Sequence, residues 1–183
     1  MKEEKVLANT CNMMEVRPAM VALPYPPVQV SAKNQSYANL LSIDYCGSVS
    51  EMSAITQYIN HENRLSCEKC PVAKAILGIA MAEMIHLQKL GEMIFLLGGN
   101  IDYIAKYRDG SQKMWTPKDL RLSKTAKEML LNNIDSEKAA INQYKMHMKI
   151  IEDMHVNAVL ARIIKDEEYH ITILKALLEE ISD

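Results

Sequence analysis

Residues 83–86 read Glu-Met-Ile-His, and residues 167–170 read Glu-Glu-Tyr-His. In an α-helix, side chains three residues apart are separated by about 60° and about 4.5 Å of rise, so the Glu and the His of each quartet project from one side and can bind one ion together. Apolar residues at helical spacing share each stripe: Ile76, Ile79, Leu87, Leu90 and Ile94 with the first quartet, and Leu160, Ile163, Ile164, Ile171 and Leu174 with the second. Both quartets are therefore predicted to face a helical core.

An internal repeat places each quartet after a second glutamate. Residues 51–61 and 137–147 share Glu, Ala, Ile, Gln, Tyr and His at equal spacings, which is six matches in eleven positions. The quartet that starts at Glu83 follows Glu51 by 32 residues, and the one that starts at Glu167 follows Glu137 by 30. The pattern indicates two copies of one helical hairpin, related by a pseudo two-fold axis.

The periodicity outside these stretches predicts an all-α fold. Apolar residues recur at three- and four-residue steps in four long segments, at about 36–63, 71–97, 123–153 and 156–181. Short links make the first and second segments one antiparallel hairpin, and the third and fourth another. A long connection over 98–122, with one capped helical turn at Thr116 to Asp119, lets the third helix cross the bundle. We expect an antiparallel four-helix bundle over residues 36–183.

The first 35 residues differ from the rest. Four of the six prolines lie in the first 27 residues: Pro18, Pro24, Pro26 and Pro27. Because proline fixes φ and lacks an N–H, this segment is predicted to form an extended arm over residues 1–35. We expect the arm to lie on its own domain or on a neighbouring subunit.

The predicted bundle buries four acids and two imidazoles, because Glu51 and Glu137 also lie on apolar lines of their helices. An unpaired buried ion costs several kcal/mol or more, so something must compensate these charges. Two divalent cations would do so, and mixed oxygen and nitrogen donors suit manganese or iron. The pattern of one Glu from each of two helices and Glu-x-x-His from the other two is typical of dinuclear carboxylate bundles. The predicted metal ligands are Glu51, Glu83, His86, Glu137, Glu167 and His170.

Several residues near these ligands have alternative interpretations. Tyr58 and Tyr144 lie seven residues after their glutamates, so their hydroxyls are candidates to hold a ligand carboxylate, with plain core aromatics as the alternative. Asp166 could accept an N–H from a ligand histidine, but a solvent-facing acid is the favoured interpretation. His61 and His147 lie about 80° away from the Glu line, and we expect ordinary residues at the core edge or surface.

Composition excludes some classes of protein. Lys and Arg number 21 against 23 Asp and Glu, for a net charge of −2, which argues against a partner bound by bulk charge; we expect no nucleic acid and no membrane. No apolar run or signal core predicts a membrane span, and four cysteines in 183 residues form no disulfide scaffold, so we expect a cytoplasmic protein. Cys67 and Cys70 are expected to be unremarkable thiols, with a redox-active or adventitious disulfide as the alternative.

From Tyr25 to Ile181 the sequence resembles the ferritin-like superfamily of di-iron and di-manganese carboxylate proteins. The stretch from Tyr25-Pro26-Pro27-Val28 through Glu51 to Tyr58-Ile59-Asn60 is similar to manganese catalases, particularly the short spore-coat type. The second and fourth helices, with Ala82 to His86 and Asp166 to His170, resemble bacterioferritin and rubrerythrin. The additional glutamate of rubrerythrins would fall at Ala140 and is missing.

The resemblance matches the six predicted ligands to the metal ligands of these families. It implies two roles for Glu167, which corresponds to a nearby acid or base in manganese catalases and to a ligand in bacterioferritins. Met84 matches the haem-ligating Met of bacterioferritin, but we expect it to fill the core and do not expect haem.

The expected function is that of a dinuclear manganese or iron oxidoreductase acting on hydrogen peroxide or dioxygen. The favoured activity is manganese-catalase-like disproportionation of peroxide, and the candidate catalytic residues are Glu167, Tyr58 and Tyr144. One alternative is a bacterioferritin- or rubrerythrin-like ferroxidase or peroxidase that uses iron. Another is a spore-coat or assembly protein whose metal site is mainly structural, which would place it with the spore. We expect a homo-oligomer, a dimer or higher.

Overall fold

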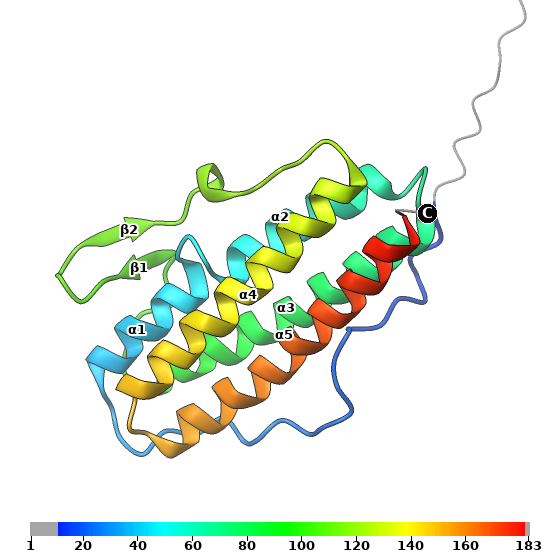
Figure 1. Cartoon of the computed structure of the whole chain (residues 1–183). Helices are drawn as coiled ribbons and strands as arrows, with labels where there is room; N and C mark the ends of the chain where they lie inside the picture. The colour runs from blue at the N-terminus through cyan, green and yellow to red at the C-terminus, as the bar shows by residue number, and fades with distance from the viewer. Residues whose placement is uncertain (1–10, 182–183) are drawn as a thin grey trace, which may run out of the picture.

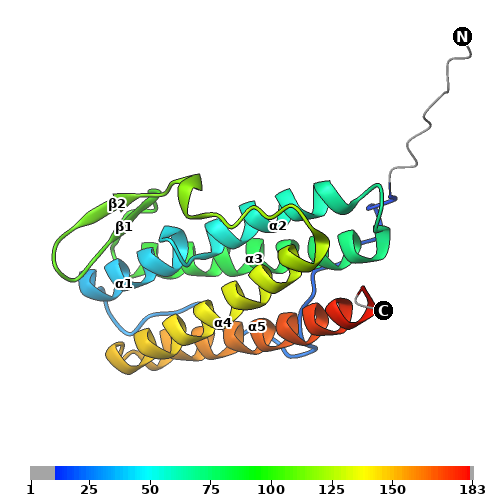
Figure 2. The same cartoon turned by 45° about the horizontal axis from the view of Figure 1, so that its top comes forward.

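The computed structural model describes residues 11–181 and is mostly helical. The long elements are α1 (Gln35–Cys46), α2 (Glu51–Leu65), α3 (Cys70–Leu96), α4 (Ala126–Ile150) and α5 (Met154–Glu180). α2 pairs with α3 and α4 with α5, and the two pairs form two layers (Figure 1, Figure 2). The predicted all-α four-helix bundle is confirmed. The second, third and fourth predicted helices begin and end within three residues of the observed bounds.

The first predicted helix is wrong, because residues 36–63 form two helices, α1 and α2, in place of one. α1 ends at Cys46, where a Cβ on Gly47 would lie only 2.6 Å from the carbonyl oxygen of Ile43. Ser50 then caps α2, because its side chain accepts the backbone N–H of Ser53. The break places Glu51 in the first turn of α2, where the helix dipole favours a carboxylate.

The crossover between α3 and α4 contains more structure than expected. The predicted capped turn is the 3-10 helix η1 (Pro117–Asp119), in which the Thr116 side chain accepts the N–H of Lys118. In addition, β1 (Ile104–Lys106) and β2 (Gln112–Met114) form an antiparallel hairpin that the helical periodicity did not predict. The Trp115 indole, just after the hairpin, donates a hydrogen bond to the Ser53 hydroxyl at 3.0 Å. This contact holds the crossover against α2.

Two apolar clusters lie on either side of a polar layer. One gathers side chains of α1, the second half of α3 and the first half of α5, including Leu41, Leu90, Ile94, Leu160 and Ile163. The other gathers side chains of α2, the first half of α3, α4 and the end of α5, including Ile76, Ile79, Leu130, Leu174 and Leu177. On α3 and α5 the residues between the clusters include both quartets, so the apolar packing encloses the predicted ligands.

The arm follows its own bundle beside α3 and α5 over its described residues, 11–34 (Figure 1). The Ala19 N–H donates to the Gly78 carbonyl of α3 at 2.8 Å, and the Asn34 N–H donates to the Leu97 carbonyl at 3.0 Å. The first ten residues of the predicted arm lie outside the described part. The division into an arm over 1–35 and a bundle over 36–183 stays a prediction.

The cysteines depart from expectation. Cys70, at the start of α3, forms a disulfide with Cys11 of the arm, so the prediction of an unremarkable thiol is wrong there. The pairing depends on the path of the arm, which sequence spacing does not show. Cys67 is an exposed free thiol and Cys46 a buried one.

α3 is, within residues 11–181, the one helix that is long and apolar enough by length and composition to cross a membrane. Half of its most apolar stretch is buried inside the bundle, and a buried core helix passes the same test. The feature is therefore weak evidence for a span.

Candidate metal centre

The six predicted ligands converge at the middle of the bundle, with one or two from each of α2, α3, α4 and α5. Each is at most 2% exposed: Glu51, Glu83, His86, Glu137, Glu167 and His170. They form two groups able to hold a metal ion, in each of which one ligand atom per residue lies within 4.8 Å of the others. The sequence pattern therefore placed these side chains in one site.

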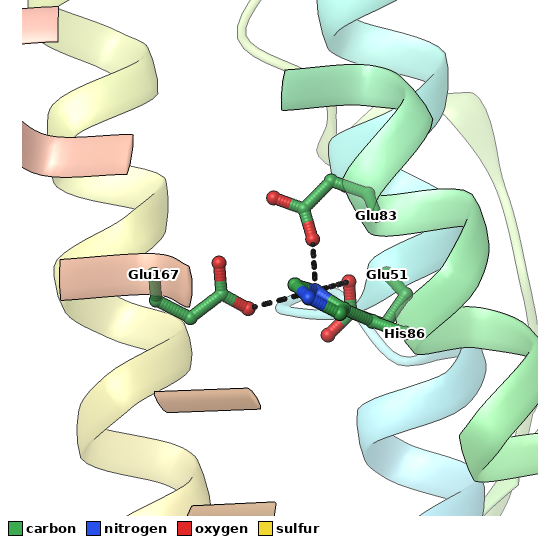
Figure 3. A group of neighbouring side chains, drawn as sticks. All are labelled: Glu51, Glu83, His86 and Glu167. Carbon is green, nitrogen blue, oxygen red and sulfur yellow. Dashed lines mark hydrogen bonds and ion pairs between the residues drawn. The ribbon is translucent and has the colours of Figure 1, made fainter. Parts of the chain in front are cut away.

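The first group surrounds the ring of His86 (Figure 3). Its Nδ1 lies 2.8 Å from Glu83 Oε2, 3.4 Å from Glu167 Oε1 and 3.7 Å from Glu51 Oε2. Three carboxylates from three helices thus face one imidazole nitrogen.

The second group repeats this arrangement around His170. Its Nδ1 lies 3.0 Å from Glu167 Oε2, 3.1 Å from Glu83 Oε1 and 3.5 Å from Glu137 Oε1. Glu83 and Glu167 each face one histidine with one oxygen and the other histidine with the second oxygen. The two rings lie 5.9 Å apart. The two groups share the carboxylates of Glu83 and Glu167, and each adds one further glutamate and one histidine. This geometry agrees with the pseudo two-fold relation in the sequence.

Hydrogen bonds on the far side of each ring fix the neutral tautomer that could ligate a metal. His86 Nε2 lies 3.2 Å from Asp166 Oδ2, and His170 Nε2 lies 2.8 Å from the Ala19 carbonyl oxygen. Both partners are acceptors, so each Nε2 carries a proton and donates. In the neutral form, each Nδ1 lone pair then points at the carboxylates. Such an arrangement is repulsive unless a cation or a proton lies between them.

The electrostatics of the metal-free cluster show the same demand for positive charge. Burial and the neighbouring carboxylates raise the pKa of Glu83 well above its usual range and that of Glu137 to about 8. The surrounding carboxylates also raise the pKa values of His86 and His170 despite burial, which acts in the opposite direction. The two histidines in turn lower the pKa of Glu167, although burial opposes them. Without a metal, protons must supply the compensating charge.

The donor set fits divalent manganese or iron. Glu83 Oε1 is buried and accepts no hydrogen bond, so one of the carboxylate oxygens shared between the groups lacks the partner that a buried acceptor requires. Carboxylate oxygens with one imidazole nitrogen per ion are the ligands that these metals accept. Both histidines face the Glu167 carboxylate, because its Oε1 lies 3.4 Å from His86 Nδ1 and its Oε2 lies 3.0 Å from His170 Nδ1.

The two tyrosines reach across the pseudo two-fold axis. The Tyr58 hydroxyl of α2 donates to Glu137 Oε1 of α4 at 2.6 Å, and the Tyr144 hydroxyl of α4 donates to Glu51 Oε1 of α2. Each hydroxyl therefore holds the glutamate of the other repeat. Burial and the adjacent carboxylates raise the pKa of both tyrosines, so both remain protonated donors.

Other candidates lie elsewhere than expected. The favoured interpretation of Asp166 as a solvent-facing acid is wrong, because the residue is fully buried behind His86. His61 and His147 are buried outside the ligand groups: His61 contacts Asn133 at 2.8 Å, and His147 contacts Asp44 at 2.7 Å. No local sequence pattern identified these polar partners, because both lie far from the histidines in the chain.

Met84 is 44% exposed, so the expectation that it fills the core is wrong. The residue follows Glu83 on α3, and the 100° step per residue turns it away from the buried quartet.

A cavity of about 250 Å³ leads to the cluster between α2 and α4. Its deep wall includes Glu51, Glu137 and both tyrosines, and its other walls include Ala54, Ala140, Gln57 and Gln143. Asp119, Arg121 and Asp135 also line it, and they place polar and charged groups at the crossover side. Gln57 and Gln143 occupy equivalent positions in the sequence repeat, so the repeat could have predicted that both line the cavity.

Comparison with known proteins places this geometry in a family. The Ferritin profile, described as a ferritin-like domain, matches residues 49–183. The manganese catalase KatB from Anabaena has a TM-score of 0.76 at 21% identity, over 88% of this chain and 79% of that chain. A Rhodobacter capsulatus bacterioferritin, described with a metal-free dinuclear site and haem iron, has a TM-score of 0.68 at 21% identity, over 82% of this chain and 88% of that chain.

The Mycobacterium tuberculosis bacterioferritin BfrA is similar as well, with a TM-score of 0.64 at 23% identity, over 82% of this chain and 89% of that chain. At such identities these structures show a shared fold alone. A search of curated proteins gave no match. The profile covers the whole bundle from Val49 onward, and the chain belongs to the ferritin-like domain family.

Proposed function

We propose that the chain binds two manganese or iron ions and carries out redox chemistry on hydrogen peroxide or dioxygen, with manganese-catalase-like disproportionation of peroxide as the leading activity. One observation carries the proposal: each imidazole Nδ1 faces three buried carboxylates, and two of those carboxylates are shared between the two imidazoles. This arrangement matches the ligand demand of a dinuclear centre.

In this proposal, Glu51 and His86 would hold one ion and Glu137 and His170 would hold the other. Glu83 and Glu167, whose carboxylates face both histidines, would complete both ligand sets. Bound manganese or iron would supply the one-electron changes that peroxide or dioxygen chemistry requires. Tyr58 and Tyr144 keep the two unshared glutamates in place by donating to them. In the manganese-catalase-like activity, the Glu167 carboxylate would accept or return a proton instead of completing both ligand sets.

The surroundings favour a small substrate. The cavity between α2 and α4 reaches the cluster through small and amide side chains, such as Ala54, Ala140 and Gln143. At about 250 Å³ it has room for peroxide or dioxygen. The apolar clusters above and below the polar layer exclude bulk water from the other directions.

The position of Glu167 favours a second candidate, an iron ferroxidase or peroxidase. Both Glu167 oxygens face a histidine, as a shared ligand would, whereas the manganese catalase resemblance implies a nearby acid or base. The third candidate, a spore-coat or assembly protein with a structural metal site, predicts bound metal without turnover. The expected homo-oligomer stays a prediction under all three.

The expected cytoplasmic location also stays a prediction. The Cys11–Cys70 disulfide weighs against it, because disulfides are rare in reducing compartments.

The test measures metal content and two activities on the purified protein loaded with manganese or iron. Oxygen release from peroxide by the manganese form supports the leading activity, and oxidation of ferrous iron without oxygen release supports the second. Zinc must be excluded during purification, because it binds such sites more tightly than manganese or iron.

Matched variants on α5 test the site itself. Glu167→Ala removes a shared carboxylate, and Glu168→Ala removes the exposed neighbour on the same helix. We expect metal loss in the first variant and wild-type metal content in the second. Unchanged metal content in both Glu167→Ala and Glu83→Ala would refute the assigned site.

A further inference from the structure

We propose that residues 19–25 of the arm are part of the metal centre, where they position both histidines so that docking of the arm and binding of metal strengthen each other. The inference rests on the proposed binding of metal by the six buried residues. It adds to that site a segment outside the four-helix bundle and outside the family match, which begins at residue 49.

The first contact is made by the arm backbone. His170 Nε2 donates to the Ala19 carbonyl at 2.8 Å, and the Ala19 N–H donates to the Gly78 carbonyl of α3 at 2.8 Å. Residue 19 therefore links α3 to the His170 ring on α5. In the described structure no bundle residue takes this place on Nε2, so departure of the arm would leave the ring without its acceptor.

The second contact runs through Asp166. Its Oδ2 accepts the Tyr25 hydroxyl at 2.7 Å and His86 Nε2 at 3.2 Å. Its Oδ1 accepts the Val21 N–H at 2.8 Å and lies 2.7 Å from Arg162 Nη1. Two of the three hydrogen-bond donors to this buried carboxylate thus belong to the arm and the third is His86, while Arg162 adds an ion pair.

Arg162 ties the arm to the same helix. Its guanidinium donates to the Leu23 carbonyl at 2.9 Å and to the Val21 carbonyl at 3.0 Å, and it lies 4.3 Å from the centre of the Tyr25 ring. Both oxygens of the Asp166 carboxylate are consequently held in place by their partners. Its direction determines the direction in which the His86 ring presents Nδ1.

The physical consequence is coupling. A ligating histidine depends on the partner of its other nitrogen for tautomer and ring orientation, and loss of such a partner costs about 10- to 100-fold in metal affinity. Because binding linkage is reciprocal, metal that selects the oriented rings must also stabilise the docked arm. The Cys11–Cys70 disulfide tethers the arm eight residues before Ala19, which keeps the arm near its docking position.

The test compares Tyr25→Phe with Tyr37→Phe. The first substitution removes the hydroxyl bonded to Asp166 and keeps the ring. The control removes a hydroxyl that accepts the Glu152 N–H at 3.2 Å and touches no histidine partner. We expect Tyr25→Phe to bind Mn²⁺ about 10- to 100-fold more weakly, and its Co²⁺-loaded form to show an altered visible spectrum. The control should match wild type in both.

A second variant shifts the arm without removing a polar group. A Cβ at Gly78 would lie 3.0 Å from the Arg17 carbonyl oxygen, so in Gly78→Ala the arm must move by a few tenths of an ångström at this point, while the helix propensity of α3 rises. We expect weaker Mn²⁺ binding together with an intact helical signal. A loss of binding caused by unfolding would show as a loss of that signal.

Hydrogen exchange on the wild-type chain measures the reverse direction of the coupling. Adding Mn²⁺ to the metal-free protein should slow exchange of the Val21 amide, and Glu83→Ala should abolish the slowing. If both Tyr25→Phe and Gly78→Ala bind Mn²⁺ like wild type and the arm exchanges at the same rate with and without Mn²⁺, the arm inference is wrong and the metal site stands. If wild type binds neither manganese nor iron, the proposed function fails and the inference fails with it.

Discussion

Replacing Glu137 with glutamine should stabilise the metal-free protein and weaken metal binding at the same time. Glu137 is 2% exposed, and burial together with Glu167 raises its pKa from 4.5 to about 8. The folded chain therefore holds a proton that the unfolded chain releases between these pH values. By linkage, the stability of the metal-free protein falls as the pH rises through this window.

The magnitude follows from the two pKa values. Their difference corresponds to about 5 kcal/mol once Glu137 is fully ionised, and to about 3 kcal/mol at pH 7. Glutamine keeps the shape and an oxygen that can accept the Tyr58 hydroxyl, but it does not ionise. Metal-free Glu137→Gln should match wild type near pH 4.5 and exceed it by an amount that grows up to about pH 9.

The assay is urea unfolding of metal-free protein at pH 5, 7 and 9, with Asp135→Asn as the control. Asp135 lies two residues away on α4, and its side chain is 57% exposed, so its substitution should change the free energy of unfolding by less than about 0.5 kcal/mol. A Glu137→Gln protein that is no more stable than wild type at pH 9 would refute the reasoning. That result would mean that the ionised carboxylate is already compensated without metal.

Three further changes test other parts of the structure. Tyr58→Phe removes the donor to Glu137 and should weaken Mn²⁺ binding about 10- to 100-fold in a calorimetric titration. Ala140→Leu narrows the cavity and should lower kcat/KM for peroxide several-fold, with metal content by elemental analysis unchanged. Cys11→Ser opens a link between residues 59 apart and should lower the free energy of unfolding by up to about 4 kcal/mol in urea, because it restores the chain entropy of the unfolded state.

The sequence predicted the parts of the site that depend on local periodicity. The quartets at Glu83 and Glu167 share a helix side whatever the rest of the chain does, and the repeat carries Glu51 and Glu137 into equivalent positions. The apolar clusters on both sides of the quartets then require the acids to meet. Tyr58 reached a ligand carboxylate as expected, although on the opposite repeat.

The parts that depend on long-range packing were not predictable in this way. Helical periodicity continues through Gly47 to Ser50, so the break between α1 and α2 leaves no gap in the apolar pattern. Asp166 reads as an ordinary surface acid, because its partners Val21 and Tyr25 lie more than 140 residues earlier in the chain. The disulfide of Cys70 depends on the same path of the arm.

The two halves of the centre share their ligands but differ in the layer behind them. In one half, Gln57 and His61 both contact the side-chain oxygen of Asn133, at 3.1 and 2.8 Å. In the other half, the equivalent Gln143 and His147 contact the two carboxylate oxygens of Asp44, at 2.8 and 2.7 Å.

The amide of Asn133 in one half thus takes the place that the carboxyl group of Asp44 takes in the other half. Asp44 and Glu51 repel each other, which contributes to the raised pKa of Asp44, although burial is the larger cause. The amide of Asn133 adds no such charge near Glu137. The two halves therefore place different polar groups behind the same ligands. We expect the two ions to bind with unequal affinities, and a calorimetric titration of the metal-free protein with Mn²⁺ should resolve two binding steps.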